Sequence, residues 1–139
     1  MAELVRFGIS LDSELLHRFD ALNTAKHYPS RSEALRDLIR QELVSHEWQQ
    51  NDRQVAGAIT FVYDHHRRAL LNQIIDIQHD FQQTIISTQH IHVDRSTCLE
   101  IIAVKGSAAD IQLLADRLRA LKGVRHGIVS MSSLGQDGG

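Results

Sequence analysis

The stretch QTIISTQHIHVDRSTCLEIIAVK (residues 83–105) contains two apolar runs on either side of the short polar segment DRS. Two apolar runs joined by a few polar residues are typical of a β-hairpin. If Val93 lies opposite Thr97 across the loop, then His92 lies opposite Cys98, with Cβ atoms roughly 4.5–5.5 Å apart. We therefore predict antiparallel strands over residues 83–93 and 97–105.

Two histidines and the single cysteine of the chain gather on this hairpin. Strand side chains alternate between faces, so His90 and His92 share one face, and the predicted register adds Cys98 to it. Imidazole and thiolate are ligands of late first-row metals. The same residues also fit a buried cysteine beside surface histidines, or a Cys–His nucleophile pair. For the last of these interpretations, the sequence near Cys98 contains no glycine-rich elbow and no oxyanion-type loop.

The alternation also divides the hairpin side chains between the two faces of the sheet. One set is expected to pack on the helices of the same chain: Ile91, Val93, Leu99, Ile101 and Ala103. The other set is expected on the opposite face: His90, His92, Cys98, Glu100, Ile102 and Val104. Apolar members of that second set would be exposed to solvent unless another subunit covers them. A fourth metal ligand is therefore expected from another chain.

The hairpin lies within a predicted β-α-β-β-α-β unit. Besides the two hairpin strands, the pattern predicts a strand over 55–64, helices over 67–81 and 107–122, and a last strand over 125–132. Gly123 closes the second helix. This order is that of a ferredoxin-like split β-α-β fold, as in ACT regulatory domains.

The N-terminal segment has the alternation of a half-buried strand. Apolar residues occupy every second position, and Arg6, Gly8 and Ser10 occupy the other face of residues 4–11. Two helices follow. Asp12 can cap the first, which ends at Tyr28-Pro29, and a capping box of Ser30 and Glu33 begins the second.

So small a β-α-α unit cannot bury a sufficient core alone, and its single strand has two unpaired edges. We expect two such strands to pair antiparallel in a dimer, with the polar face outward. A two-stranded ribbon fits the DNA major groove. This pattern, with its helix start Arg31–Ala34, resembles the ribbon-helix-helix repressors. The alternative is that the ribbon serves only for dimerisation.

The expected DNA contacts follow from side-chain chemistry. Arg6 can donate to guanine and Ser10 to a base edge, whereas Gly8 has no side chain to read a base. The start of the second helix can hold phosphate through Ser30, Arg31 and Ser32. Glu33 and Asp37 lie one turn apart and present paired carboxylates, which are either a weak cation site or an ordinary acidic helix face.

Composition sets the class of protein. The chain has 139 residues, 42% of them hydrophobic and 23% charged, and a net charge of −2. The charge gives no general attraction to nucleic acid, so DNA binding must depend on local placement. No apolar run approaches the length of a membrane span, and the N-terminus lacks a signal-peptide core. A single cysteine suits a reducing compartment, and we expect a cytoplasmic protein.

With both halves in place, the chain resembles the nickel-responsive transcriptional regulator family. The resemblance covers residues 4–132, and the order His-x-His then Cys-Leu-Glu behind a ribbon-helix-helix module is its most specific part. The motifs that carry it are Val5–Leu11, Ser30–Ala34, Val62-Tyr63 with His65, Gln78-His79, Gln89–His92, Cys98–Glu100, Lys105-Gly106 and Gly123–Gly127.

The resemblance implies a homotetramer in which a core of four regulatory domains is flanked by two DNA-binding dimers. It implies one Ni(II) per subunit, in a planar site formed by His90, His92 and Cys98 of one subunit and His79 of a neighbour. Planar coordination by nitrogen and sulfur suits Ni(II) or Cu(II) better than Zn(II). Glu100 shares the face of Cys98 and can orient a ligand imidazole. Tyr63 and His65 share a strand face and either line the site or are simply exposed. For Glu33 and Asp37 the resemblance implies a low-affinity cation site between domains when DNA is bound, with an ordinary acidic helix face as the equal alternative.

These observations predict an α+β chain with three parts: a ribbon-helix-helix DNA-binding domain over 1–48, an ACT-like metal-binding and tetramerisation domain over 54–133, and a disordered tail over 134–139. The predicted function is a nickel-responsive repressor of a palindromic operator, not an enzyme. Two alternatives stay open. An amino-acid-responsive regulator would use the ACT-like half, and a metalloenzyme or a nickel storage or delivery protein would not need the outward face of the ribbon.

Overall fold

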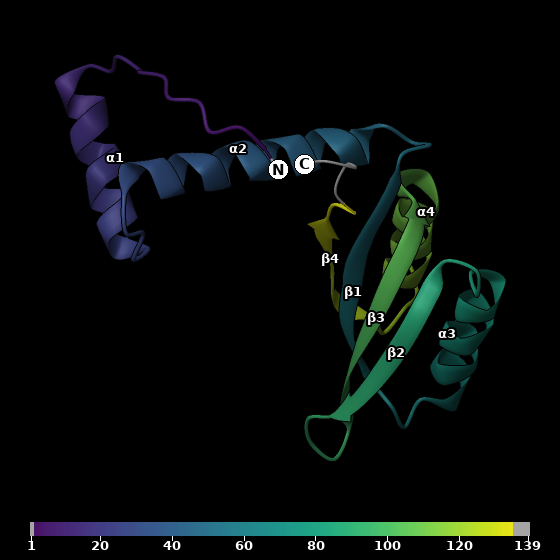
Figure 1. Cartoon of the computed structure of the whole chain (residues 1–139). Helices are drawn as coiled ribbons and strands as arrows, with labels where there is room; N and C mark the ends of the chain where they lie inside the picture. Colours follow the sequence, from purple (N-terminus) through teal and green to yellow (C-terminus); the bar gives the residue numbers. More distant parts are fainter. Residues whose placement is uncertain (1, 135–139) are drawn as a thin grey trace. The chain divides into compact units, whose positions relative to one another are not determined.

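The computed structural model describes residues 2–134 of the chain (Figure 1). Within this range the chain divides into two compact units, residues 2–43 and residues 44–134. No helix in the described range combines the length and the apolar character needed to cross a membrane. Of the tail expected at 134–139, all but the first residue lies outside the described residues.

Two helices build the first unit. Helix α1 (Ser13–Ala25) begins where the Asp12 carboxylate accepts a hydrogen bond of 2.8 Å from the backbone of Leu15, so the predicted cap is confirmed. Helix α2 (Arg31–Gln49) begins with the Ser30 hydroxyl accepting from the backbone N–H of Glu33 at 3.1 Å. The Glu33 carboxylate binds the Arg36 guanidinium, so only the first half of the capping box is seen.

The half-buried strand predicted over residues 4–11 is wrong for the isolated chain. Residues 2–12 form no strand, and Val5, Phe7 and Ile9 are 64–74% exposed. The reason is physical, because a strand is defined by its hydrogen bonds to a second strand and this unit contains none to pair with. The apolar alternation is present, but nothing within one chain covers it.

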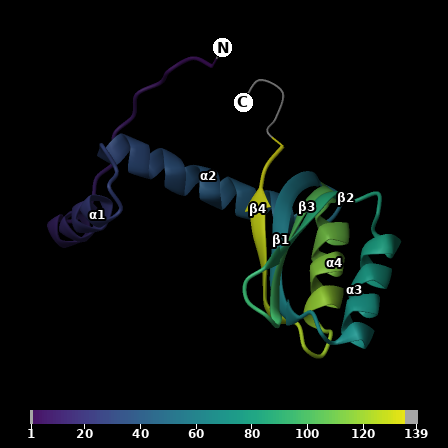
Figure 2. The ribbon, with the colours of Figure 1, turned by 90° about the horizontal axis from the view of Figure 1, so that it is seen from below.

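A four-stranded antiparallel sheet and two helices build the second unit. Its strands and helices are β1 (Gln54–Asp64), α3 (Arg68–Asp80), β2 (Ile85–His92), β3 (Thr97–Ser107), α4 (Ala108–Arg119) and β4 (Arg125–Ser132). The strands lie in the order β2-β3-β1-β4, with β2 and β4 at the edges. Figure 2 shows both helices on the same face of the sheet. The predicted ferredoxin-like, ACT-like order is confirmed.

The core lies between the sheet and the two helices, and it corrects the predicted faces of the hairpin. Cys98, Glu100, Ile102 and Val104 are at most 1% exposed. The three apolar ones share one cluster with helix residues such as Leu114. The other face of β3 is only half-buried, at Leu99, Ile101 and Ala103. The prediction that Cys98, Glu100, Ile102 and Val104 point away from the helices, with Leu99, Ile101 and Ala103 toward them, is therefore wrong. Strand alternation shows which residues share a face, but both faces of β3 carry apolar residues, so the pattern does not show which one meets the helices.

We predict that the core position Leu114 on α4 matters far more than its neighbour. Leu114 has no exposed surface, whereas Leu113 is 51% exposed. Leu114→Ala should lower the free energy of unfolding by about 2–5 kcal/mol, because it leaves a cavity. Leu113→Ala, as the matched control, should change it by about 0.5 kcal/mol or less. Denaturant unfolding of the metal-free chain measures both, and equal losses would contradict the described packing.

Candidate metal centre and nucleic-acid interface

The β2–β3 hairpin has the predicted register. His92 pairs with Cys98 and His90 pairs with Glu100. Val93 donates its backbone N–H to the carbonyl of Thr97 at 2.9 Å. The Asp94 carboxylate closes the loop by accepting from the backbone N–H groups of Ser96 and Thr97 at 3.0 and 2.8 Å. These two hydrogen bonds hold the pKa of Asp94 below its ordinary value, and the bond from Ser96 has the larger effect.

A buried carboxylate network lies directly beneath the histidines. Glu100 has no exposed surface, and its Oε1 lies 2.6 Å from His90 Nδ1 and accepts from the Tyr63 hydroxyl at 3.2 Å. Its other oxygen, Oε2, accepts from the side-chain amide of Gln78. Burial raises the pKa of Glu100, and His90, Gln78 and Tyr63 act in the opposite direction. Hydrogen bonding through Nδ1 leaves Nε2 as the His90 atom that can bind a metal.

Cys98 belongs to the same site and lies on β3, between His92 on β2 and Tyr63 on β1. The thiol is 1% exposed, and Cys98 is paired with Tyr63 on β1. Burial raises the pKa of Tyr63, and its hydrogen bond with Cys98 raises it further. The Tyr63 hydroxyl also lies 3.4 Å from His90 Nδ1. Tyr63 therefore touches both the carboxylate network and the cysteine.

His65 lies next to the hairpin, just after the end of β1. Its backbone N–H donates to the Ser96 carbonyl at 3.0 Å, and its ring centroid is 4.7 Å from that of His92. The same ring is 4.3 Å from that of His66. Within the described residues its Nδ1 is buried without a hydrogen-bond partner. The structure thus brings His65 to the candidate site.

His79 lies in the last turn of α3 and is exposed. Its neighbour Gln78 is tied to Glu100, which fixes that end of the helix beside the sheet. In residues 2–134 of a single chain, no group of three or more His, Cys, Asp or Glu side chains is arranged to hold a metal ion. One chain therefore does not bring the four expected ligands together.

Sequence reasoning missed Gln78 as a member of the site. Its amide oxygen also accepts from the Thr88 hydroxyl at 3.4 Å, which links α3 to β2. Glutamine is common on helix surfaces, and the spacing between Gln78 and Glu100 carries no periodic signal. Only the position beside His79 could have drawn attention to it.

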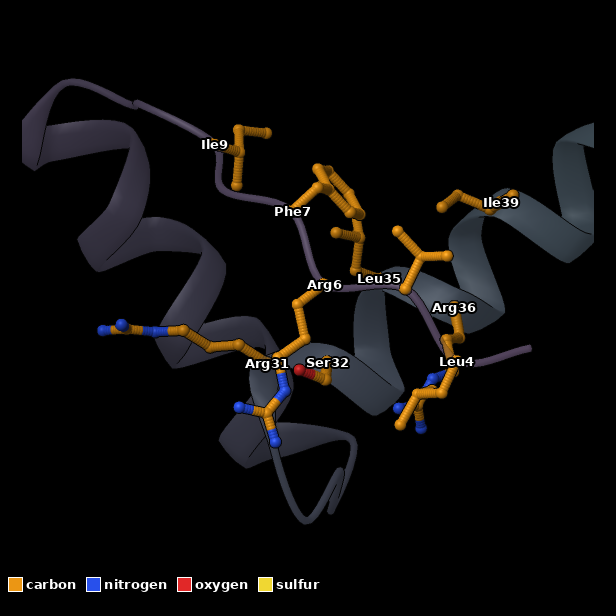
Figure 3. A pocket seen from close by; sticks show the side chains of 10 residues that line it. Leu4, Arg6, Phe7, Ile9, Arg31, Ser32, Leu35, Arg36 and Ile39 are labelled. Atoms are coloured by element: carbon orange, nitrogen blue, oxygen red, sulfur yellow. The ribbon is translucent and has the colours of Figure 1, made fainter.

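The predicted DNA contacts gather where the N-terminal segment passes the start of α2. Figure 3 shows Arg6 from that segment and Arg31 and Ser32 from α2 lining one pocket. Ser10 lines a second pocket, which also includes Arg31. A Cβ added at Gly8 would meet nothing within 4 Å, so this position is open.

Several of these polar groups already have partners in the isolated unit. The Arg31 guanidinium forms two hydrogen bonds of 2.9 Å to Asp20 on α1, which hold the pKa of Asp20 below its ordinary value. Asp37 accepts from the Tyr28 hydroxyl, which raises the pKa of Tyr28. Since Glu33 binds Arg36, neither carboxylate of the expected cation pair is without a partner.

Comparison with known proteins covers both units. Residues 56–132 match the family described as the NikR C-terminal nickel-binding domain. Residues 5–44 match the ribbon-helix-helix proteins of the CopG family. A "Putative nickel-responsive regulator" of Syntrophus aciditrophicus is 59% identical over 98% of this chain and 98% of its own length. A protein of the same name from Chlorobium limicola is 56% identical over 97% of this chain and all of its own. The solved structure of an uncharacterized protein from Thermotoga maritima has a similar fold, with a TM-score of 0.50 and 20% sequence identity. The similarity covers 59% of this chain and 99% of that protein.

We predict that Asp94 holds the hairpin loop. Asp94→Ala removes the acceptor of two backbone N–H groups. Amide hydrogen exchange at Ser96 and Thr97 should become roughly two- to tenfold faster, in line with the net contribution of a hydrogen bond. Arg95→Ala, in the same loop, is the control and should leave both rates unchanged. Unchanged rates in Asp94→Ala would show that the strands alone hold the turn.

Proposed function

This chain belongs to the family of nickel-responsive transcriptional regulators, and we propose that it represses transcription by binding operator DNA when nickel occupies its regulatory unit. The observation that carries the proposal is the hairpin register. It places His92 opposite Cys98 and His90 above the buried Glu100, in a chain that begins with a ribbon-helix-helix unit.

For the metal, we propose one Ni(II) per subunit, held by His90, His92 and Cys98 and by His79 of a neighbouring subunit. Three imidazoles and one thiolate form the donor set that planar Ni(II) accepts. The position of the histidines supports an intersubunit site, because β2 is an edge strand and His90, His92 and His79 are all exposed. Nickel there would supply a rigid link between two subunits.

The residues around this donor set have distinct tasks. Glu100 fixes the ring of His90 from its buried position. Tyr63 donates to Oε1 of that carboxylate and lies opposite Cys98 on the neighbouring strand, and Gln78 ties α3 to the other oxygen, Oε2. The His65 ring lies beside that of His92, tilted by 32°, and restricts its movement. Supporting partners of this kind commonly change metal affinity 10- to 100-fold.

For the assembly, we propose a homotetramer in which two dimers of ribbon-helix-helix units flank the regulatory domains over 54–133. Support comes from the apolar side chains at Val5, Phe7 and Ile9, which only a second copy of residues 4–11 would cover in a paired ribbon. The reduced Cys98 and the expected nickel chemistry fit a cytoplasmic protein.

For DNA, we propose a palindromic operator, because a two-fold dimer reads two equivalent half-sites. Arg6 and Ser10 would contact base edges beside the open position at Gly8. The start of α2, with Ser30, Arg31 and Ser32, would contact phosphate. Glu33 and Asp37 would bind a cation only weakly, because Arg36 and Tyr28 compete for them.

We predict that nickel controls DNA affinity through Cys98 and His79. A duplex that the protein selects from a random-sequence pool with nickel present serves as the probe. Nickel should raise the affinity of the natural chain for it by about 5- to 150-fold, the usual range of coupling between two sites. The titration should show a thiolate-to-nickel absorption band that saturates at one nickel per chain.

Cys98→Ala should abolish both the band and the gain in DNA affinity, and His79→Ala should weaken both. His17→Ala, at an exposed histidine of α1, is the control and should behave as the natural chain. Equal DNA affinity with and without nickel in the natural chain would refute the proposed function.

We predict that Arg6 reads a base. Arg6→Ala should cost about 1–3 kcal/mol of DNA binding, measured with nickel present, and the loss should be larger for the selected duplex than for a scrambled one. Lys122→Ala removes an exposed cation from the other unit and should have little effect. An equal loss on both duplexes would make Arg6 a phosphate contact instead.

A further inference from the structure

The last turn of α2 is built into the regulatory unit. Helix α2 runs from Arg31 to Gln49 without interruption, but from Val44 onward it belongs to the second compact unit. Leu43 is 58% exposed, whereas Val44 packs against the core and Trp48 is 4% exposed. One helix therefore serves both units, and its final turn is fixed to the sheet.

Trp48, the only tryptophan, is the main contact of that turn. Its indole N–H donates to the Ser132 carbonyl of β4 at 3.0 Å. The ring lies over Gly57 of β1, where an added Cβ would be 3.1 Å from the indole and 2.5 Å from the Ser130 carbonyl. The glycine is thus required for the close approach of the indole and β4 to β1.

The linker after α2 is also tied down. Glu47 lies 3.6 Å from the Arg53 guanidinium. The carbonyls of Arg53 and Asn51 accept from the first amides of α4, those of Ala108 and Ala109, at 2.9 and 3.0 Å. These bonds satisfy helix N-terminal donors that otherwise need a cap or water. The connection from α2 to β1 is therefore part of the folded regulatory unit, not a loose tether.

Two strands lead from the candidate metal centre to this turn. Strand β1 has Tyr63 beside Cys98 near one end and Gly57 beneath Trp48 near the other. Strand β3 carries Cys98 and Glu100 and runs on to Ser107, immediately before the α4 amides that bind the linker. Six residues of extended chain separate Tyr63 from Gly57, about 20 Å at the usual rise of a strand.

We propose that Trp48 is the positioning residue through which the regulatory sheet acts on the DNA-binding helix α2. This rests on the proposed function, because it names the place where nickel-dependent changes in the sheet enter α2. A change at β1 or β4 alters the contacts of the indole and, through them, the final turn of α2, the helix whose first residues carry the proposed phosphate contacts. Trp48 belongs neither to the proposed nickel ligands nor to the proposed DNA contacts.

The test compares the gain in DNA affinity that nickel produces in full-length variants, using the selected duplex. Trp48→Ala should reduce this gain at least about fivefold, the lower limit of ordinary coupling. Its nickel affinity without DNA and its absorption band should stay within about twofold of the natural chain. Trp48→Phe, which keeps an aromatic ring but loses the N–H donor, should fall between. Gln49→Ala, at the exposed neighbouring position, is the control and should keep the full gain.

A second pair of variants leaves Trp48 intact and decides the matter if Trp48→Ala does not fold. Gln41→Gly combined with Glu42→Gly softens α2 at two exposed positions before the fixed turn. This double variant should also lose the gain, whereas the matched Gln41→Ala, Glu42→Ala pair should keep it. A full gain in both Trp48→Ala and the double-glycine variant would overturn the inference. So would a loss in Trp48→Ala that only follows weaker nickel binding. No gain in the natural chain would instead refute the proposed function itself.

Discussion

Glu100 is a carboxylate without exposed surface inside an apolar core, and the candidate metal centre is arranged around it. A buried carboxylate is tolerated only where protein donors replace the water it has lost. Here the donors come from three elements: Tyr63 on β1, His90 on β2 and Gln78 on α3. The requirement to satisfy this one group therefore fixes how the helix and both strands meet. The same requirement sets the ring of His90 and ties Gln78, the neighbour of His79, to the sheet.

Two parts of the described chain lack the partners that they need. The histidines lie on an edge strand and on a helix end, and the described chain gathers no complete set of metal ligands. The N-terminal segment is unfinished in the same way, with apolar side chains exposed and no strand partner. Under the proposed assembly, a second copy of the chain would supply both missing parts. Metal binding and DNA binding would then both depend on assembly, so each could influence the other.

The sequence predicted the regulatory unit well because its signals are local. Alternation, the DRS loop and the helix caps predicted six elements in the correct order and the pairing of His92 with Cys98. Two failures have clear physical causes. Both faces of β3 carry apolar residues, so period-two alternation could not show that Cys98 and Glu100 face the helices. A strand over residues 4–11 would need hydrogen bonds to a second strand, and the described part of the first unit contains none. Gln78 was missed because its role arises only from its distance to Glu100 in space.

The division of α2 between the two units bears on how a metal could control DNA binding at all. A ligand shifts a conformational equilibrium only through contacts that differ between the two states. If α2 ended in a loose linker, a change in the sheet would not reach Arg31, however tightly the sheet bound nickel. Instead Trp48, Glu47 and the linker carbonyls fix the final turn to β1, β4 and α4. The final turn of α2, from Val44 to Gln49, is therefore part of the regulatory unit. Under the proposed assembly, a second subunit that completes the metal site would bind the same sheet to which the final turn of α2 is fixed.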